Sequence, residues 1–165
     1  MVDAIETFLF QTLGRELCVF ICSMIPIIEL RGAIPLGAGM GMGLVETYLL
    51  SIIGNMIPVP FILLLIRAVL DFMKKVKGLK KIALWVEAKA VKHKGKIEKY
   101  AYVGLFLFVA IPIPGTGAWT GSLIAALMRM KFWKSLLWVT LGVLTAGVIM
   151  SVISFGIAGA IGFFA

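Results

Sequence analysis

Two charged residues, Glu29 and Arg31, lie inside an otherwise apolar segment, PIIELRGAIP at residues 26–35. The guanidinium of an arginine can bind a carboxylate or a phosphate through two parallel hydrogen bonds. A glutamate in such a segment can exchange a proton or a cation. A charge at the centre of a membrane helix costs about 2.5–3.5 kcal/mol on insertion scales, so we expect both residues to have a function. The alternative is that they pair with each other and only fix the loop.

A second break occurs at residues 111–117, IPIPGTG, where Pro112 follows Pro26 by 86 positions. In lipid, an unwound turn leaves backbone N–H and C=O groups without partners, at a cost of several kcal/mol each. Such turns survive only where protein or a water-filled cavity surrounds them. We therefore expect the two loops to face each other. The helix N-termini beside them would offer free N–H groups to an anion.

These considerations predict one substrate-binding or ion-binding site. The hydroxyl groups after the second break could bind substrate or satisfy the loop backbone, Trp119 could be a gate or packing, and Asn55 could form a hydrogen bond across the bundle. We expect no catalytic site, metal site or cofactor, because the sequence shows no nucleophile–base set and no cluster of metal ligands. The predicted residues are Glu29, Arg31, Gly32, Pro35, Asn55, Pro112, Pro114, Gly115, Thr116, Gly117, Trp119 and Thr120.

The composition places these residues in a membrane protein. Of the 165 residues, 61% are hydrophobic, whereas soluble domains contain about 45–50% apolar residues. The net charge of +8 is concentrated, with ten lysines between Lys74 and Lys99. No nucleic-acid motif accompanies this charge. It is typical of cytoplasmic segments of membrane proteins, which carry excess lysine and arginine and attract anionic lipids.

The chain divides into repeat 1 at residues 17–66, a basic amphipathic linker helix at 67–99, and repeat 2 at 100–165. The arms 17–28, 100–111 and 118–128 would each be about 17–18 Å long, roughly half of a ~30 Å hydrocarbon core. This length favours hairpins that enter and leave the membrane on the same side. The alternative is four simple spans.

The distribution of charge also favours hairpins, because they place segment 74–99 and turn 129–134 together in the cytoplasm. With four spans, the cations of turn 129–134 would lie outside. We therefore predict an all-α integral membrane protein with two re-entrant helical hairpins and two spanning helices. The halves would form an inverted repeat, with the amphipathic cytoplasmic helix between them. Inverted repeats with broken helices are a recurring transporter design.

The segments ELRGAIP at 29–35 and PIPGTGAWTG at 112–121 resemble the two signature loops of the prokaryotic small multidrug export protein family. The resemblance extends from about Cys22 to about Ser151. That family is similar in layout to the DedA/VTT superfamily, whose members have facing re-entrant loops and act as lipid or lipid-carrier-phosphate translocases. The resemblance implies a transporter in the plasma membrane of a prokaryote. The chain departs from the DedA pattern in having no arginine or lysine between Lys99 and Arg129.

We expect a multi-pass, ion-coupled exporter of an amphiphilic or anionic substrate, bound between the two loops. One alternative is a flippase or scramblase for phosphorylated lipid carriers. Another is a membrane scaffold that transports nothing. The expected partners are membrane lipids and a small amphiphilic or lipid-phosphate substrate, without nucleic acid. Glycine-rich faces are compatible with a homodimer.

Overall fold

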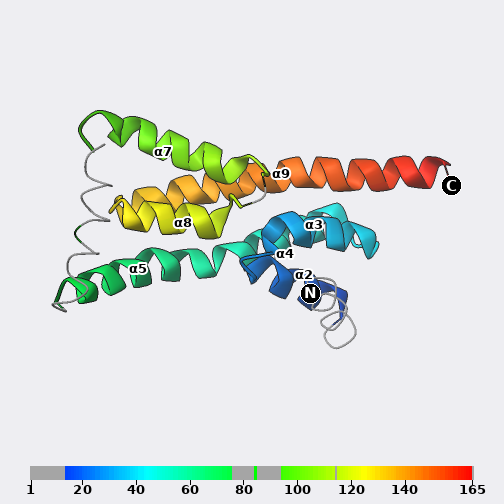
Figure 1. Cartoon of the computed structure of the whole chain (residues 1–165). Coiled ribbons are helices and arrows are strands. Elements are labelled where there is room, and N and C mark those ends of the chain that lie inside the picture. Colours follow the sequence, from blue (N-terminus) through cyan, green and yellow to red (C-terminus); the bar gives the residue numbers. More distant parts are fainter. Residues whose placement is uncertain (1–13, 76–83, 85–93, 114, 165) are drawn as a thin grey trace. The chain divides into compact units, whose positions relative to one another are not determined.

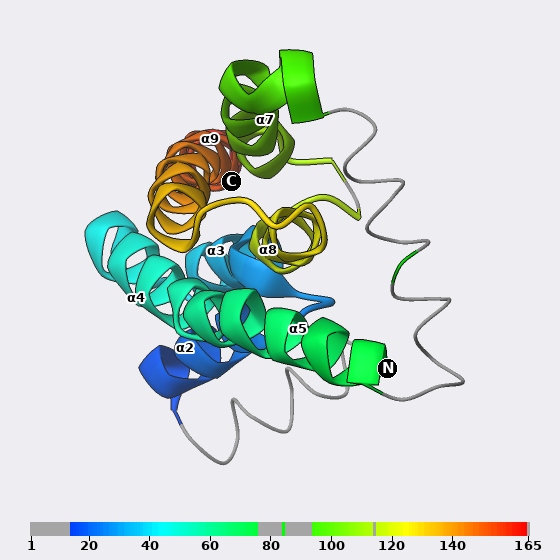
Figure 2. The same ribbon diagram turned by 90° about the vertical axis from the view of Figure 1, so that its left-hand side faces the viewer.

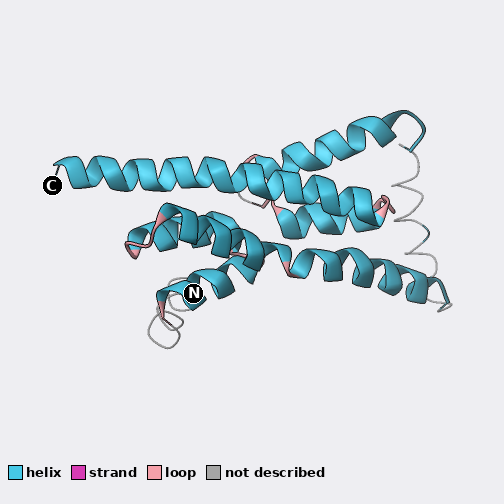
Figure 3. Cartoon of the chain, turned by 180° about the vertical axis from the view of Figure 1, so that it is seen from behind, coloured by secondary structure: helices cyan, strands magenta, loops and turns pink. Residues whose placement is uncertain are grey.

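The computed structural model describes residues 14–75, 84, 94–113 and 115–164, all of them in helices or short connecting loops (Figure 3). The chain forms two compact units. Unit 1 contains the described parts of residues 1–58 and 143–165, and unit 2 contains those of residues 59–142. The predicted all-helical class is therefore confirmed for the described part of the chain.

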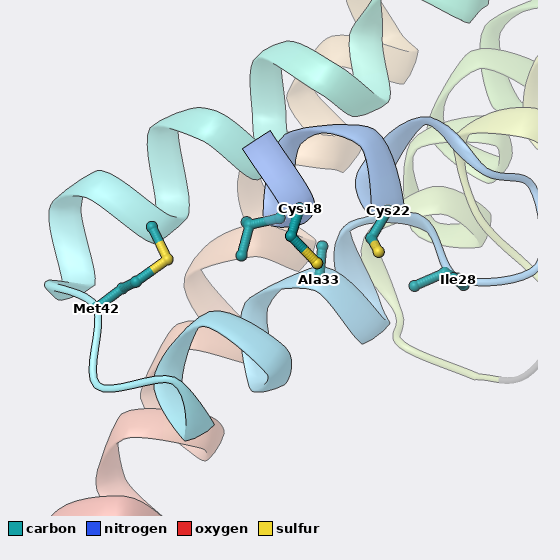
Figure 4. Packing of buried hydrophobic residues seen from close by; sticks show 6 residues of the cluster. Cys18, Cys22, Ile28, Ala33 and Met42 are labelled. Atoms are coloured by element: carbon teal, nitrogen blue, oxygen red, sulfur yellow. The ribbon is translucent and has the colours of Figure 1, made fainter. Parts of the chain in front are cut away.

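Three short helices form the amino-terminal part of unit 1: α2 (Arg15–Met24), α3 (Glu29–Gly39) and α4 (Leu44–Met56) (Figure 1). The Arg15 guanidinium at the start of α2 donates a hydrogen bond to the Met40 carbonyl after α3, at 3.2 Å. Helices α2 and α3 are thus an antiparallel pair, and α4 packs against both. Their apolar contact is centred on Cys18, Cys22 and Ala33, all completely buried (Figure 4).

Unit 2 contains α5 (Pro58–Lys75) from its second residue on, α7 (Lys94–Ala110), α8 (Ala118–Leu127) and the beginning of α9 (Phe132–Phe164). Helices α7 and α8 pack together and are joined at one end by the second break (Figure 2). Beyond the far end of α8, the Lys131 N–H donates to the Tyr102 hydroxyl in the middle of α7, at 3.2 Å. Since the second break joins the end of α7 to the start of α8, this contact shows that the pair is antiparallel as well.

The turns that end α3 and α8 have the same backbone hydrogen bonds, at positions 88 residues apart. The Met42 N–H donates to the Gly37 carbonyl, and the Met130 N–H to the Ala125 carbonyl, both at 3.0 Å. The residues immediately before these two methionines are Gly41 and Arg129, and their φ angles are 71° and 51°. Both turns are Schellman motifs, in which a left-handed residue lets the chain satisfy the last carbonyls of a helix.

Close helix contacts repeat between the two halves as well. A Cβ atom on Gly54 would lie 2.5 Å from the Phe20 carbonyl oxygen and 2.0 Å from the Ser23 hydroxyl oxygen. A Cβ atom on Gly142 would lie 3.1 Å from the Phe106 carbonyl oxygen and 2.7 Å from the Val109 side chain. Phe106 and Val109 follow Phe20 and Ser23 by 86 positions each. The helix after each antiparallel pair therefore approaches the first helix of that pair in the same way.

Two helical stretches are long and apolar enough to cross a membrane: Leu44–Ile66, which covers α4 and the start of α5, and Phe132–Ile157 in α9. Within the chain, only 28% of the most apolar 18-residue part of the first stretch is buried, and 33% of that of the second. The core helix of a soluble protein would be mostly buried, so the exposed apolar surface indicates contact with lipid. The predicted membrane class agrees with this, while the re-entrant inverted arrangement stays a prediction.

The helix boundaries differ from the sequence prediction around the basic segment. Helix α5 continues to Lys75, and α7 begins at Lys94 rather than at residue 100. Both ends of the predicted linker helix 67–99 thus belong to neighbouring helices, and residues 76–83 and 85–93 lie outside the described residues. Apolar residues at helical spacing occur on both sides of these boundaries, so periodicity alone could not place them.

We expect Gly142→Ala to destabilise the protein, because the added Cβ atom must displace Val109 or the backbone of α7. Overpacking of this kind costs about 1–3 kcal/mol. Thermal unfolding of the purified protein in detergent measures the effect. Gly156→Ala in the same helix is the matched control, because a Cβ atom there meets nothing within 4 Å. Equal melting temperatures for the two variants would contradict the close contact.

Candidate functional site

The first break lies between α2 and α3, and its backbone is hydrogen-bonded locally. The Ile25 N–H donates to the Cys22 carbonyl at 3.2 Å, and the Glu29 N–H donates to the Ile25 carbonyl at 2.8 Å. Pro26 and Ile27 at the tip are exposed, and Ile28 is buried. The chain therefore reverses here while keeping most of its backbone bonds.

Glu29 is the first residue of α3, and its conformation is unusual. Its φ angle is 51°, in the left-handed region that residues other than glycine, asparagine and aspartate seldom adopt. Its side chain is also buried, with 4% exposed. A strained backbone costs about 1–3 kcal/mol and persists only where the surrounding structure holds it. Such residues occur most often at functional sites, so Glu29 is the strongest candidate in unit 1.

Arg31 lies two residues further along α3 and is half-buried. The negative charge of Glu29 interacts favourably with its guanidinium. This interaction agrees with either sequence interpretation, a pair that only fixes the loop or a pair that also binds an ion or substrate. The burial and strain of Glu29 favour the second.

Gly32 and Pro35 shape α3 and contribute no polar side chain. A Cβ atom on Gly32 would lie 2.5 Å from Cγ2 of Ile28, so the buried isoleucine needs a glycine there. Pro35 is exposed and lies inside α3, so the helix starts before it and continues past it. Both residues were predicted as site residues because they lie in the segment 29–35, which was expected to be a loop. The structure places them inside the helix α3.

The second break, between α7 and α8, is held by Thr116 and two glycines. The Thr116 hydroxyl lies 2.9 Å from the Ile113 carbonyl oxygen and 3.1 Å from that of Ile111. Gly115 and Gly117 have φ angles of 84° and 136°, which favour glycine. Of the two roles that the sequence left open for Thr116, satisfaction of the loop backbone is the one seen.

The remaining predicted residues of the second break lie around this loop. Pro112 precedes it, and Trp119 and Thr120 lie in the first turn of α8; all three are half-buried. Pro114 lies outside the described residues. The residues of the first break and Asn55 belong to unit 1, and those of the second break belong to unit 2. That the two loops face each other stays a prediction.

Asn55 is the third member of a polar stripe on α4, together with Thr47 and Ser51. The three residues are spaced four apart, so they occupy one face of the helix. All three are completely buried. Among the described residues, no hydrogen-bond partner is found for the two hydroxyl oxygens or for either atom of the Asn55 amide group. Leaving a buried polar group without a partner costs about 1–3 kcal/mol, so this stripe is unfavourable for the stability of the fold.

The stripe runs along α3 toward the first break. Thr47, at the end of the stripe farthest from the first break, lies against Gly37 of α3. A Cβ atom on Gly37 would lie 2.5 Å from the methyl group of Thr47. Asn55 lies eight residues after Thr47, and Glu29 lies eight residues before Gly37. In antiparallel helices with a rise of about 1.5 Å per residue, these equal separations place Asn55 and Glu29 at the same level. The backbones of Asn55 and Glu29 are thus at about the same level in unit 1.

Sequence reasoning identified Asn55 and missed Thr47 and Ser51. The signal was available, since the spacing of four recurs in a segment that is otherwise mostly apolar. In the second half, Ser135 follows Thr47 by 88 positions and is also completely buried, without a partner for its hydroxyl among the described residues. Valines follow Ser51 and Asn55 by the same interval, at 139 and 143. The full stripe therefore belongs to the first half alone.

Within the described residues, no group of three histidine, cysteine, aspartate or glutamate side chains could hold a metal ion. The chemistry available at the first break is thus one carboxylate and one guanidinium, with the Asn55 amide at about the same level. The Ser51 and Thr47 hydroxyls lie about one and two helical turns further along α4. This set can bind and release a small cation or a proton, and it can pair an anion. It contains no nucleophile activated by a neighbouring base.

Comparison with known proteins identifies a family for the chain. The family described as "Putative small multi-drug export protein" matches residues 29–149, from the strained glutamate to the middle of α9. Neither the curated proteins nor the solved structures contain a match to the chain. The family match covers well over half of the 165 residues. The chain therefore belongs to the small multi-drug export protein family, whose name is that of a membrane transporter.

Proposed function

We propose that this protein is an ion-coupled secondary transporter that exports an amphiphilic or anionic substrate. Glu29 exchanges the coupling ion, and Arg31 pairs the negative group of the substrate. The observation that carries this proposal is the buried, left-handed Glu29 at the first break. Burial of a carboxylate in an apolar unit and strain in its backbone are both unfavourable, and function is the reason that such a residue is retained.

The polar stripe of α4 supplies the route by which the ion reaches Glu29. Thr47, Ser51 and Asn55 offer hydroxyl and amide oxygens about 6 Å apart along the helix. Water or a cation that moves between these oxygens exchanges one set of partners for the next. The stripe begins beside Gly37, close to the turn before α4, and ends at the level of Glu29.

The proposal includes the re-entrant, inverted arrangement of the two halves. It is supported by the antiparallel packing of α2 with α3 and of α7 with α8, and by the matching turns and glycine contacts of the two halves. It is also supported by an ion pair in unit 2 between Asp71, near the end of α5, and Arg129, after α8. With four simple spans these two residues would lie on opposite sides of the membrane. We place both in the cytoplasm, with turn 40–43 outside.

A flippase for phosphorylated lipid carriers is the second candidate, because a guanidinium binds phosphate as readily as carboxylate. It differs from the first in needing no ion gradient. In liposomes that contain the purified chain, movement of a fluorescent lipid phosphate across the bilayer without an ion gradient would favour the flippase. A non-transporting scaffold would move neither this lipid phosphate nor an amphiphilic anion.

The topology is tested by cysteine accessibility in intact cells, in a background with Cys18→Ala and Cys22→Ala. Single cysteines replace Lys75, Lys131 or Gly43, all exposed, and an impermeant thiol reagent is added outside. We expect labelling of Gly43→Cys only, and labelling of the other two after the cells are opened. Labelling of one lysine position but not the other in intact cells would favour four simple spans.

Coupling is tested with the purified chain in liposomes that contain a pH-sensitive dye, under an imposed proton or sodium gradient. A panel of fluorescent amphiphilic anions serves as substrate. We expect Glu29→Gln to abolish the dependence of uptake on the gradient. We expect Arg31→Gln to raise the half-saturating probe concentration about tenfold or more, since a hydrogen bond to a charged group contributes about 1.5–3 kcal/mol.

Glu46→Gln is the matched control for these variants, because Glu46 is an exposed acid in the first turn of α4. It should transport like the unmodified protein. If Glu29→Gln and Arg31→Gln fold normally and transport like this control, the two residues only fix the loop and the proposed mechanism is wrong.

The stripe is tested with Thr47→Val and Ser51→Ala. Because their hydroxyls lack partners among the described residues, we expect unchanged or higher melting temperatures but slower gradient-driven ion movement into the liposomes. Thr140→Val is the matched control, since the Thr140 hydroxyl already donates to the Leu136 carbonyl at 2.7 Å. Normal ion movement in the stripe variants would show that the stripe is no part of the ion route.

A further inference from the structure

A cavity of about 190 Å³ lies between α7 and α8 in unit 2. Its lining is almost wholly apolar and comes from Gly104, Leu105 and Phe108 on α7 and from Ile124, Met128 and Met130 at and after α8. A cavity of about 150 Å³ lined by apolar side chains is large enough for a benzene-sized molecule. The α7–α8 cavity is partly open, so it can admit a longer, flexible apolar chain. It contains none of the predicted transport residues.

The end of this cavity at Met128 and Met130 adjoins a cationic turn. Lys131 and Lys134 are both exposed there, and the Lys134 ammonium lies 5.7 Å from the centre of the Tyr102 ring. Arg129 of the same turn is already paired with Asp71. Among the described side chains of this turn, the two lysines therefore supply positive charge to a ligand whose apolar part lies in the cavity.

Aromatic residues indicate the membrane depth of this end. Trp133 and Tyr100 expose 78% and 73% of their surfaces. Trp133 lies in the same turn, and Tyr100 lies two residues before Tyr102, whose hydroxyl accepts the hydrogen bond from the Lys131 N–H. Tryptophan and tyrosine with such exposure are enriched where lipid headgroups meet the hydrocarbon. The lysines thus lie at headgroup level, and the cavity extends from there toward the acyl chains.

We propose that unit 2 holds one anionic phospholipid, with its phosphate against Lys131 and Lys134 and an acyl chain in the α7–α8 cavity. Charge complementarity selects this occupant over a zwitterionic lipid, and the apolar lining selects it over a free phosphate. The site is independent of the transport mechanism proposed above, because it contains neither Glu29 nor the polar stripe. The lipid is a resident ligand of the fold.

Native mass spectrometry of the full chain in detergent tests this site, with phosphatidylglycerol and phosphatidylcholine as probes. We expect one phosphatidylglycerol to bind in preference to phosphatidylcholine. Each lysine near a membrane surface contributes about 1 kcal/mol to binding an anionic lipid, a factor of about five, so Lys131→Gln with Lys134→Gln should weaken binding about 25-fold. Arg15→Gln, at an exposed cation on α2 of unit 1, is the control for charge.

Gly104→Leu tests the cavity without disturbing the fold. A Cβ atom on Gly104 meets nothing within 4 Å, and leucine is a better helix former than glycine. We expect this variant to keep its melting temperature and to lose the tightly bound phosphatidylglycerol. Gly156→Leu, at an equally open glycine of α9, should bind lipid normally.

Three outcomes would overturn the proposal. The first is equal binding of the two lipids, and the second is unchanged phosphatidylglycerol binding in folded Gly104→Leu. The third is loss of a dimer in Gly104→Leu in the absence of lipid, which would make the cavity a contact between copies of the chain. None of these results depends on transport, so the site and the transport mechanism fail or succeed separately.

Discussion

Inside a membrane, every backbone N–H and C=O must find a partner within the protein or in a water-filled space. This constraint explains the design of both breaks. At the first, the chain reversal is held by local backbone hydrogen bonds within residues 22–29, from the Ile25 N–H to the Cys22 carbonyl and from the Glu29 N–H to the Ile25 carbonyl. At the second, the Thr116 hydroxyl takes over part of that task, and two glycines adopt angles that other residues avoid. Helix breaks can exist in so apolar a chain because part of the backbone of each is hydrogen-bonded within a few residues.

The same constraint makes the two halves alike in backbone and different in side chains. Both halves use an antiparallel helix pair, a Schellman turn and a glycine contact with the next helix. The left-handed position before α8 is Gly117, whereas the corresponding position at α3 is Glu29. Only the first half accepts strain and a buried charge there. The scaffold is therefore repeated, and the chemistry is concentrated in one copy.

Much of this arrangement could be predicted from the sequence. Composition gave the membrane class, proline and glycine gave both breaks, and two motifs gave the family. The basic segment was assigned one helix because its apolar spacing continues past Lys75, and spacing carries no information about helix ends. The role of Thr116 and the burial of the α4 stripe depend on three-dimensional contacts. Polar residues such as Thr47 show their isolation only once the helices that surround them are in place.

The position of α9 has a consequence for biogenesis. Unit 1 is completed by residues after Gly142, where the Tyr48 hydroxyl donates to the Leu144 carbonyl across 96 positions, at 3.2 Å. All of unit 2 lies between those two residues in sequence, so it leaves the ribosome before unit 1 can close. Contacts between residues distant in sequence form late, because loop closure must come first. Because of this order of synthesis, unit 2 can fold first, and unit 1, which carries Glu29, is the last to complete its packing.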